Sequence, residues 1–348
     1  KVRLKFSLLM QRASVLGVCI CCCLSLTSIF DTLTNTKLCS IQNLIFLLII
    51  ISYRLGHIAI LVHLVTNHRM LKRNTNCLLA VIDSQQTISP TAVMLYLLNI
   101  LSALICIHVS FPILAIATRP IEWYKYPSSI NRDFLYPLCV VYFNTALRIS
   151  ANFIRRQTEQ IFFSTAIMSS VKTTKNRSLV HMKTRLRAMK TIQLDDWQTN
   201  SMTIGLELVE RALNNLLNCF RLPITTMVAT DMVEIVYSSA NIASGNYNWW
   251  GSWPFLLASI VRISINLSSP ALLNKEVRQV RETLRIIKRR VNQSSKLELA
   301  KALEIIDMLP SFSCYGLFTL GPHAFLPLLS TCITFALVSF QDMKDRAT

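Results

Sequence analysis

The sequence predicts an all-α membrane protein with seven transmembrane helices, an N-terminus on the inner side of the membrane and a C-terminus on the outer side. Three observations lead to this fold class. Only 16% of the 348 residues are charged and 52% are hydrophobic, whereas soluble domains carry about 25% charged residues. Apolar stretches long enough to cross a bilayer recur along the chain. The basic residues are concentrated in alternate connections between these stretches.

The apolar stretches define the expected spans. A bilayer core about 30 Å thick requires about 20 apolar residues in a helix. Seven stretches meet or approach this length, namely 14–30, 44–66, 91–117, 134–154, 219–243, 249–268 and 315–340. The first is short, and the fifth contains Asp231 and Glu234. We therefore expect a single seven-helix domain over residues 1–348.

The positions of Lys and Arg set the orientation, because positively charged connections stay cytoplasmic. With the N-terminus inside, the cytoplasmic segments 1–13, 67–90, 155–218 and 269–314 hold 26 of the 36 basic residues. The outer segments 31–43, 118–133, 244–248 and 341–348 hold 6. Removing one helix from the count would invert the later connections and break this pattern. The helix count and the charge distribution thus support each other.

The two long cytoplasmic segments, 155–218 and 269–314, are expected to contain helices. One apolar stripe with steps of three and four residues runs along an otherwise basic helix, through Val277, Val280, Leu284, Ile287 and Val291. A second helix is expected after Asn292-Gln-Ser-Ser, with Leu297, Leu303, Ile306 and Leu309 on its apolar side. Periodicity alone allows these helices to lie on the membrane surface or to pack against each other as an oligomer anchor.

Charged residues inside the predicted spans are candidates for function, since each costs about 2.5–3.5 kcal/mol at the centre of a membrane helix. Asp231 and Glu234 are three residues apart, so they share one helix face. Arg54 lies at a comparable predicted depth. A buried ion pair with Arg54 is the structural interpretation, which we favour. A polar ligand cavity that opens outward is the functional alternative, and the same carboxylates can serve both.

Aromatic residues near the outer ends of the later spans provide further ligand-binding candidates. Trp and Tyr are common at headgroup depth, and Trp253 beside Pro254 fits such a belt. Small-molecule sites are mostly apolar with few polar groups, so the deeper Tyr142 and Tyr237 are better suited to a pocket. His108 and Trp253 complete the candidate set with Asp231 and Glu234.

Several function classes lack support in the sequence. No phosphate loop, His-Glu-x-x-His or Gly-x-Ser-x-Gly is present, so neither an enzyme nor a cofactor is expected. The 11 cysteines lie mostly in apolar stretches, and no zinc spacing occurs. A net charge of +18 comes without a nucleic-acid-binding motif. The expected partner is therefore the lipid bilayer, and neither a metal nor a nucleic acid is expected.

The final predicted span has the most specific pattern. Thr334, Val338 and Gln341 are spaced i, i+4 and i+7, so they lie on one helix face. An apolar ring can block ions and a polar ring can replace hydration. This face is therefore suited to a narrow pore.

Residues 312–341, FSCYGLFTLGPHAFLPLLSTCITFALVSFQ, resemble the C-terminal signature of insect gustatory receptors. That signature has an aromatic-Gly-x-Phe-Thr-Leu entry, followed by Thr-Tyr, five mostly apolar residues and Gln-Phe. The matching residues are Gly316, Phe318, Thr319, Leu320, Thr334 and Gln341. Phe335, Asp342 and Gly321 stand where the family commonly has Tyr, Phe and Asn.

The resemblance implies a gustatory receptor that acts as a ligand-gated, non-selective cation channel in the plasma membrane. Such a channel is a tetramer, either homomeric or formed with related receptors, and a small-molecule tastant opens it. By the same resemblance, the last helix lines the pore, with Val338 as the apolar gate and Gln341 as the adjacent polar ring. The cytoplasmic helices would form the shared anchor.

Three alternatives remain at this point. An odorant receptor of the same superfamily shares the architecture but favours a more apolar pocket. A G-protein-coupled receptor has the opposite polarity, and the sequence contains neither Asp-Arg-Tyr after the third span nor Asn-Pro-x-x-Tyr in the seventh. A secondary transporter would require internal repeats and interrupted helices at mid-membrane, and we find no such repeat.

Overall fold

The structure is a computed structural model of the whole chain. It describes residues 41–83, 126–167, 196–243, 249–289, 291, 293–313, 315–316 and 319–347, together with isolated positions between 19 and 34. Seven helices can be followed in these residues, which contain no strand apart from one isolated bridge. They are α2 (Ile41–Thr66), α3 (His68–Asp83), α5 (Tyr126–Ile167), α7 (Asp196–Ala243), α8 (Trp249–Lys288), α9 (Gln293–Met308) and α10 (Pro322–Ala347). The prediction of an all-α fold is confirmed for the residues that the structure describes.

Five predicted spans fall on described helices. The stretches 44–66, 134–154, 219–243 and 249–268 lie in α2, α5, α7 and α8, while 315–340 overlaps α10. This last helix begins at Pro322, later than predicted, because the residues before it form a tight turn. The span 91–117 lies outside the described residues, and 14–30 is described only at isolated positions.

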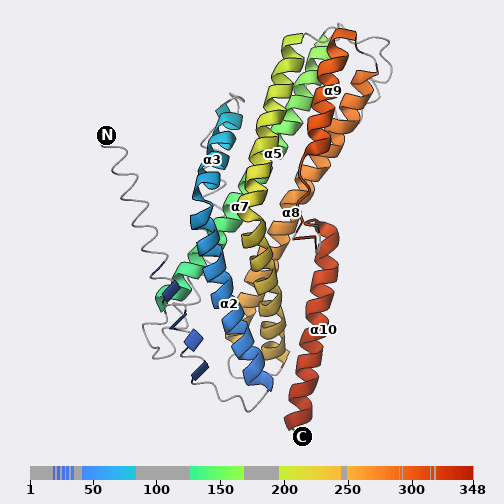
Figure 1. Cartoon of the computed structure of the whole chain (residues 1–348). Helices are drawn as coiled ribbons and strands as arrows, with labels where there is room; N and C mark the ends of the chain where they lie inside the picture. Colours follow the sequence, from blue (N-terminus) through green and yellow to red (C-terminus); the bar gives the residue numbers. More distant parts are fainter. Residues whose placement is uncertain are drawn as a thin grey trace, which may run out of the picture.

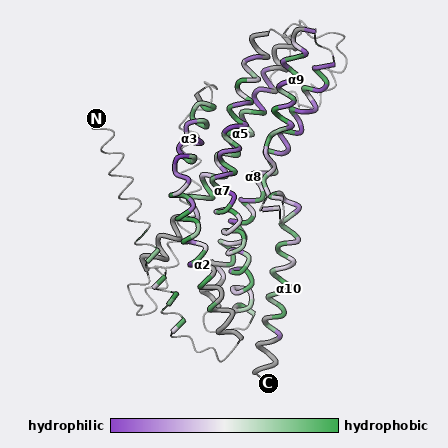
Figure 2. Tube along the Cα trace, in the orientation of Figure 1, coloured by the Kyte–Doolittle hydropathy of each residue, from purple (hydrophilic) through white to green (hydrophobic). Residues whose placement is uncertain are grey.

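Three helices are much longer than a membrane requires. Helices α5, α7 and α8 contain 42, 48 and 40 residues, whereas a bilayer core is crossed by about 20. They run together from the lower to the upper half of the molecule (Figure 1). Hydrophilic residues are concentrated in the upper half and apolar residues in the lower half (Figure 2). The long helices thus join an apolar bundle, which forms the lower half of the molecule, to a polar extension, which forms the upper half.

Length and composition identify one clear membrane-spanning candidate among the described residues, Leu256–Lys288. Two shorter apolar segments, Arg54–Thr66 and Pro322–Val338, lie in α2 and α10. Polar residues within the bundle, described below, lower the hydropathy of other predicted spans. The number of spans and their orientation therefore remain proposals.

The ends of four helices lie close together. The start of α2, the end of α7, the start of α8 and the end of α10 lie at the lower end of the molecule (Figure 1). Each adjoins a segment predicted to lie outside. The α7–α8–α9 extension, which the sequence places inside, forms the opposite end.

Helices α2 and α3 are nearly continuous. The backbone NH of Asn67 donates to His63 O at 3.0 Å, and Leu71 NH donates to Asn67 O at 3.0 Å, so helical hydrogen bonding crosses the junction. Much of the predicted connection 67–90 is therefore helical and continues to Asp83. Its buried Leu78 and Val81 pack into the core.

The extension is held together by apolar packing within the chain. Of the predicted α8 stripe, Val280, Leu284, Ile287 and Val291 are buried. Helix α9 contributes Leu299, Ala302, Leu303 and Ile306 to the same core. Arg281 of α8 also forms an ion pair with Asp307 of α9, with Nε and Oδ1 2.6 Å apart. These helices therefore pack against one another within the chain, and their role as an oligomer anchor stays a prediction.

One residue of this prediction is placed differently. Leu297 was expected on the apolar side of α9, but it is 65% exposed. The buried positions follow the spacing 299, 302, 303 and 306, and Leu297 falls outside that stripe.

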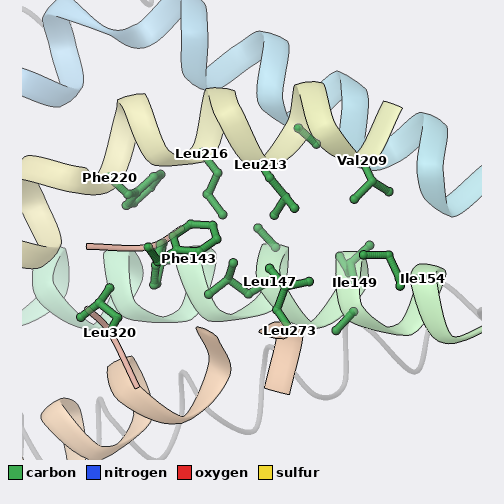
Figure 3. Packing of buried hydrophobic residues seen from close by; sticks show 14 of the residues in the cluster. Phe143, Leu147, Ile149, Ile154, Val209, Leu213, Leu216, Phe220, Leu273 and Leu320 are labelled. Carbon is green, nitrogen blue, oxygen red and sulfur yellow. The ribbon is translucent and has the colours of Figure 1, made fainter. Parts of the chain in front are cut away.

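Helices α5 and α7 also pack through apolar side chains. Figure 3 shows this contact, where Phe143, Leu147 and Ile154 of α5 face Phe220, Leu213 and Val209 of α7.

Candidate functional site: a buried ion cluster and the exposed face of α10

A buried ion cluster joins α7 to α8 within the apolar bundle. Arg262 Nη2 lies 2.5 Å from Asp231 Oδ1 and 3.3 Å from Glu234 Oε2. Ser259 Oγ donates to Glu234 Oε2 at 3.0 Å and accepts from Arg262 Nη2 at 3.0 Å. The side chains of Asp231 and Arg262 are 0% and 3% exposed, and that of Glu234 is 15% exposed. The cluster is therefore largely closed to solvent, with Glu234 at its more accessible edge.

The cluster belongs to a polar stripe along α8. Ser259, Arg262, Asn266 and Ser269 recur with steps of three and four residues and are all buried. Asn266 Oδ1 accepts a hydrogen bond of 3.1 Å from Asn144 Nδ2 of α5. Asn144 Nδ2 also donates to Val140 O at 2.7 Å. Polar contacts therefore connect α8 to both α7 and α5.

The sequence analysis predicted that the two carboxylates pair with a basic residue of another helix, which is correct, but it named the wrong residue. Asp231 and Glu234 share a partner on a different helix, and that partner is Arg262. We had proposed Arg54, which is buried on α2 at 9% exposure. Arg262 could have been found from the sequence, because Ser259, Arg262, Asn266 and Ser269 form a polar face within an otherwise apolar segment.

Tyr142, a predicted pocket residue, makes packing contacts toward α3. Its hydroxyl lies 2.8 Å from Thr75 Oγ1 and accepts a 3.2 Å hydrogen bond from Asn74 Nδ2. Its ring stacks on Phe220 with centroids 5.2 Å apart. Thr75 belongs to the connection 67–90, so the Tyr142 hydroxyl is directed to α3 and away from the cluster of Asp231 and Glu234.

The other ligand-binding candidates are separated. Tyr237 is half-buried on α7, one turn after Glu234, and packs against the core. Trp253 is 47% exposed near the start of α8. His108 lies outside the described residues. The structure thus brings together Asp231 and Glu234, with Tyr237 adjacent along the same helix.

Helix α10 has two different faces. Cys332 and Ala336 are 1% and 8% exposed, and Cys332 Sγ lies 3.6 Å from Met232 O of α7. Val338 is 57% exposed, and Thr334 and Gln341 are also exposed. These three predicted pore residues lie on the side of the helix opposite Cys332 and Ala336. Since Met232 follows Asp231, the packed face of α10 meets α7 beside the ion cluster.

The structure is thus a helical bundle in which a buried polar cluster between α7 and α8 lies beside the final helix, α10. No protein-family model matches the chain, and no curated protein matches its sequence significantly. The fold is similar to that of the insect olfactory receptor OR5 from Machilis hrabei, with a TM-score of 0.67 and 11% identity, covering 93% of this chain and 88% of that chain. The same receptor in complex with eugenol gives a TM-score of 0.60 over the same shares of both chains, also at 11% identity. The likeness shows a shared fold.

Proposed function

We propose that the chain is a chemosensory receptor that acts as a ligand-gated, non-selective cation channel in the plasma membrane. It spans the membrane seven times, with an inside N-terminus, and assembles as a homo- or hetero-tetramer with related receptors. The fold similarity to an insect olfactory receptor and the 26 basic residues in the predicted inner segments support this proposal.

The observation that carries the proposal is the exposed face of α10. A single chain leaves Val338 57% exposed while it buries Ala336, two residues away, at 8%. In an assembly with α10 at the centre, Thr334, Val338 and Gln341 from each subunit form successive rings. The valine ring is narrow and apolar and closes the pore by excluding water, while the Gln341 ring lies one turn further along.

The ligand is a small molecule that enters from outside among the helices around α7 and α8. Glu234 is the best-supported contact, because it is the more accessible carboxylate of the cluster. Tyr237, Trp253 and His108 are further candidates. A ligand that displaces α7 acts on α10 through the contact between Cys332 and Met232.

Two receptor types fit the proposal. The C-terminal resemblance and the charged core support a gustatory receptor opened by a tastant. The second candidate is an odorant receptor, which the fold similarity to an olfactory receptor favours. A more apolar pocket is expected for the odorant type, so the charged core leads us to prefer the gustatory type.

Imaging of the purified protein in detergent tests the assembly. We expect particles of four subunits with α10 from each subunit around a central axis. Expressing cells should also carry a cation current that is absent from cells expressing an unrelated membrane protein. A monomeric particle, or α10 at the rim of the assembly, would contradict the proposal.

A further inference from the structure

The connection between α9 and α10 is a tight hairpin. Leu320 NH donates to Phe312 O at 2.8 Å, and Ser313 pairs with Thr319 in an antiparallel bridge. At the tip, Tyr315 and Gly316 have φ angles of 49° and 79°. A side chain on Gly316 would meet no atom within 4 Å, so backbone conformation is what favours glycine there.

The base of the hairpin is fixed in the core of the bundle. Phe312 and Leu320 are 2% and 4% exposed. The Phe312 ring meets Phe143 edge to face, with centroids 5.8 Å apart. Phe143 in turn lies 6.1 Å from Phe220 of α7. The hairpin is therefore attached to α5 and α7 through aromatic packing.

The tip of the hairpin is held separately by α7. The guanidinium carbon of Arg221 lies 4.5 Å from the centroid of the Tyr315 ring. Arg221 Nε is buried and has no hydrogen-bond partner in the part of the chain that the structure describes. Tyr315 is nevertheless 51% exposed. The contact with Arg221, rather than burial, accounts for the position of this aromatic side chain.

The hairpin also determines where α10 begins. Thr319 Oγ1 lies 2.8 Å from His323 Nε2, and Ala324 NH donates to Gly321 O at 3.0 Å. Pro322 is the first helical residue, a position where proline is favoured. The first turn of α10 is therefore continuous with the hairpin, and movement of one displaces the other.

We propose that Arg221 and Tyr315 are positioning residues that couple α7 to the inner end of α10. Arg221 lies on the helix that carries Asp231 and Glu234, ten positions before Asp231. A shift of α7 moves the Arg221–Tyr315 contact, the hairpin and the start of the pore helix together. This inference rests on the proposed role of α10, and it assigns a second link besides the Cys332 contact.

Basal current per surface-expressed channel tests the coupling. We expect Tyr315→Leu and Arg221→Gln each to change it by about two- to thirty-fold, the range corresponding to one cation–π contact. Tyr315→Phe retains the aromatic face and should resemble the wild type. The double variant Arg221→Gln/Tyr315→Leu should change the current no more than either single variant. Arg278→Gln, which alters an exposed arginine on α8, is the matched control.

Hydrogen exchange of the first turns of α10 in the purified protein provides a readout independent of conduction. Exchange should be faster in Tyr315→Leu and unchanged in Tyr315→Phe. If hydrogen exchange follows this pattern but neither the wild type nor any variant carries current, the channel proposal fails and the attachment of α10 stands. If Tyr315→Phe behaves like Tyr315→Leu, or the effects of the two single variants on current add, the coupling is overturned.

Discussion

Arg262 Nη2 and Asp231 Oδ1 lie 2.5 Å apart, although 31 positions separate the two residues in the sequence. Arg262 Nε also donates to the same oxygen at 2.9 Å. Glu234 joins the pair from one turn further along α7. The three side chains meet at only one relative rotation and height of α7 and α8. The cluster therefore fixes how these two helices are placed against each other.

The first prediction concerns Arg262→Met. This change leaves Asp231 and Glu234 buried without their shared cation, and removal of one partner of a buried pair costs about 3–5 kcal/mol. We expect a large loss of folded protein and of thermal stability, measured in detergent by size-exclusion chromatography and thermal unfolding. Arg211→Met is the control, since the Arg211–Glu207 pair is exposed and should contribute less than about 1 kcal/mol.

Removing all three charges at once separates the effect of unpaired buried charge on stability from the effect of altered packing. The variant Arg262→Met/Asp231→Leu/Glu234→Gln leaves no charge in the cluster, so it should recover most of the stability lost in Arg262→Met. A single variant as stable as the wild type would contradict the structural importance of the cluster. So would a triple variant no better than the single one.

The second prediction concerns Tyr142→Phe. The ring stack on Phe220 is retained, but the hydroxyl contacts with Thr75 and Asn74 are lost. We expect destabilisation of about 0.5–1.5 kcal/mol per hydrogen bond, measured by thermal unfolding, with basal current unchanged. An altered current at unchanged stability would instead assign Tyr142 to the ligand-response machinery.

The third prediction concerns orientation. Basic residues favour a cytoplasmic N-terminus and an extracellular C-terminus. Antibody against epitope tags on intact cells should therefore label the C-terminal tag alone, and both tags should become accessible after permeabilisation. Labelling of only the N-terminal tag on intact cells would reverse the orientation and favour the G-protein-coupled alternative.

The fourth prediction concerns Val338→Ser. A polar side chain at a narrow apolar ring favours hydration, so basal current per surface-expressed channel should rise. Ile333→Ser is the matched control, because Ile333 is also exposed, at 50%, but lies about 140° around the helix from Val338. An equal rise in both variants would argue against a specific gate at Val338.

The sequence predicted the helical segments well where hydrophobic periodicity was strong. Helix α8 ends at Lys288, close to the expected break at Asn292-Gln-Ser-Ser, but α9 begins at Gln293, within that break rather than after it. The late start of α10 was missed because the hairpin depends on long-range packing of Phe312 against Phe143. A local apolar pattern does not contain that information.

The candidate site was predicted only in part, for a similar reason. The spacing of Asp231 and Glu234 required a shared partner, but periodicity cannot decide which helix faces them. Depth along the membrane pointed to Arg54, whereas the packing of α7 on α8 selected Arg262. Tyr142 was likewise assigned to a pocket because its contacts with α3, on Asn74 and Thr75, are not visible in the sequence.

The reversal potential of the channel with Gln341→Glu and Gln341→Lys tests the proposed pore most directly. A ring of charged side chains in a conducting pore changes its ion selectivity. With NaCl lower outside than inside, Glu should move the reversal potential toward that of Na⁺ and Lys toward that of Cl⁻. The same exchanges at the exposed Gln293 of α9 should have no such effect. If both Gln341 variants conduct with the wild-type reversal potential, α10 does not line the pore.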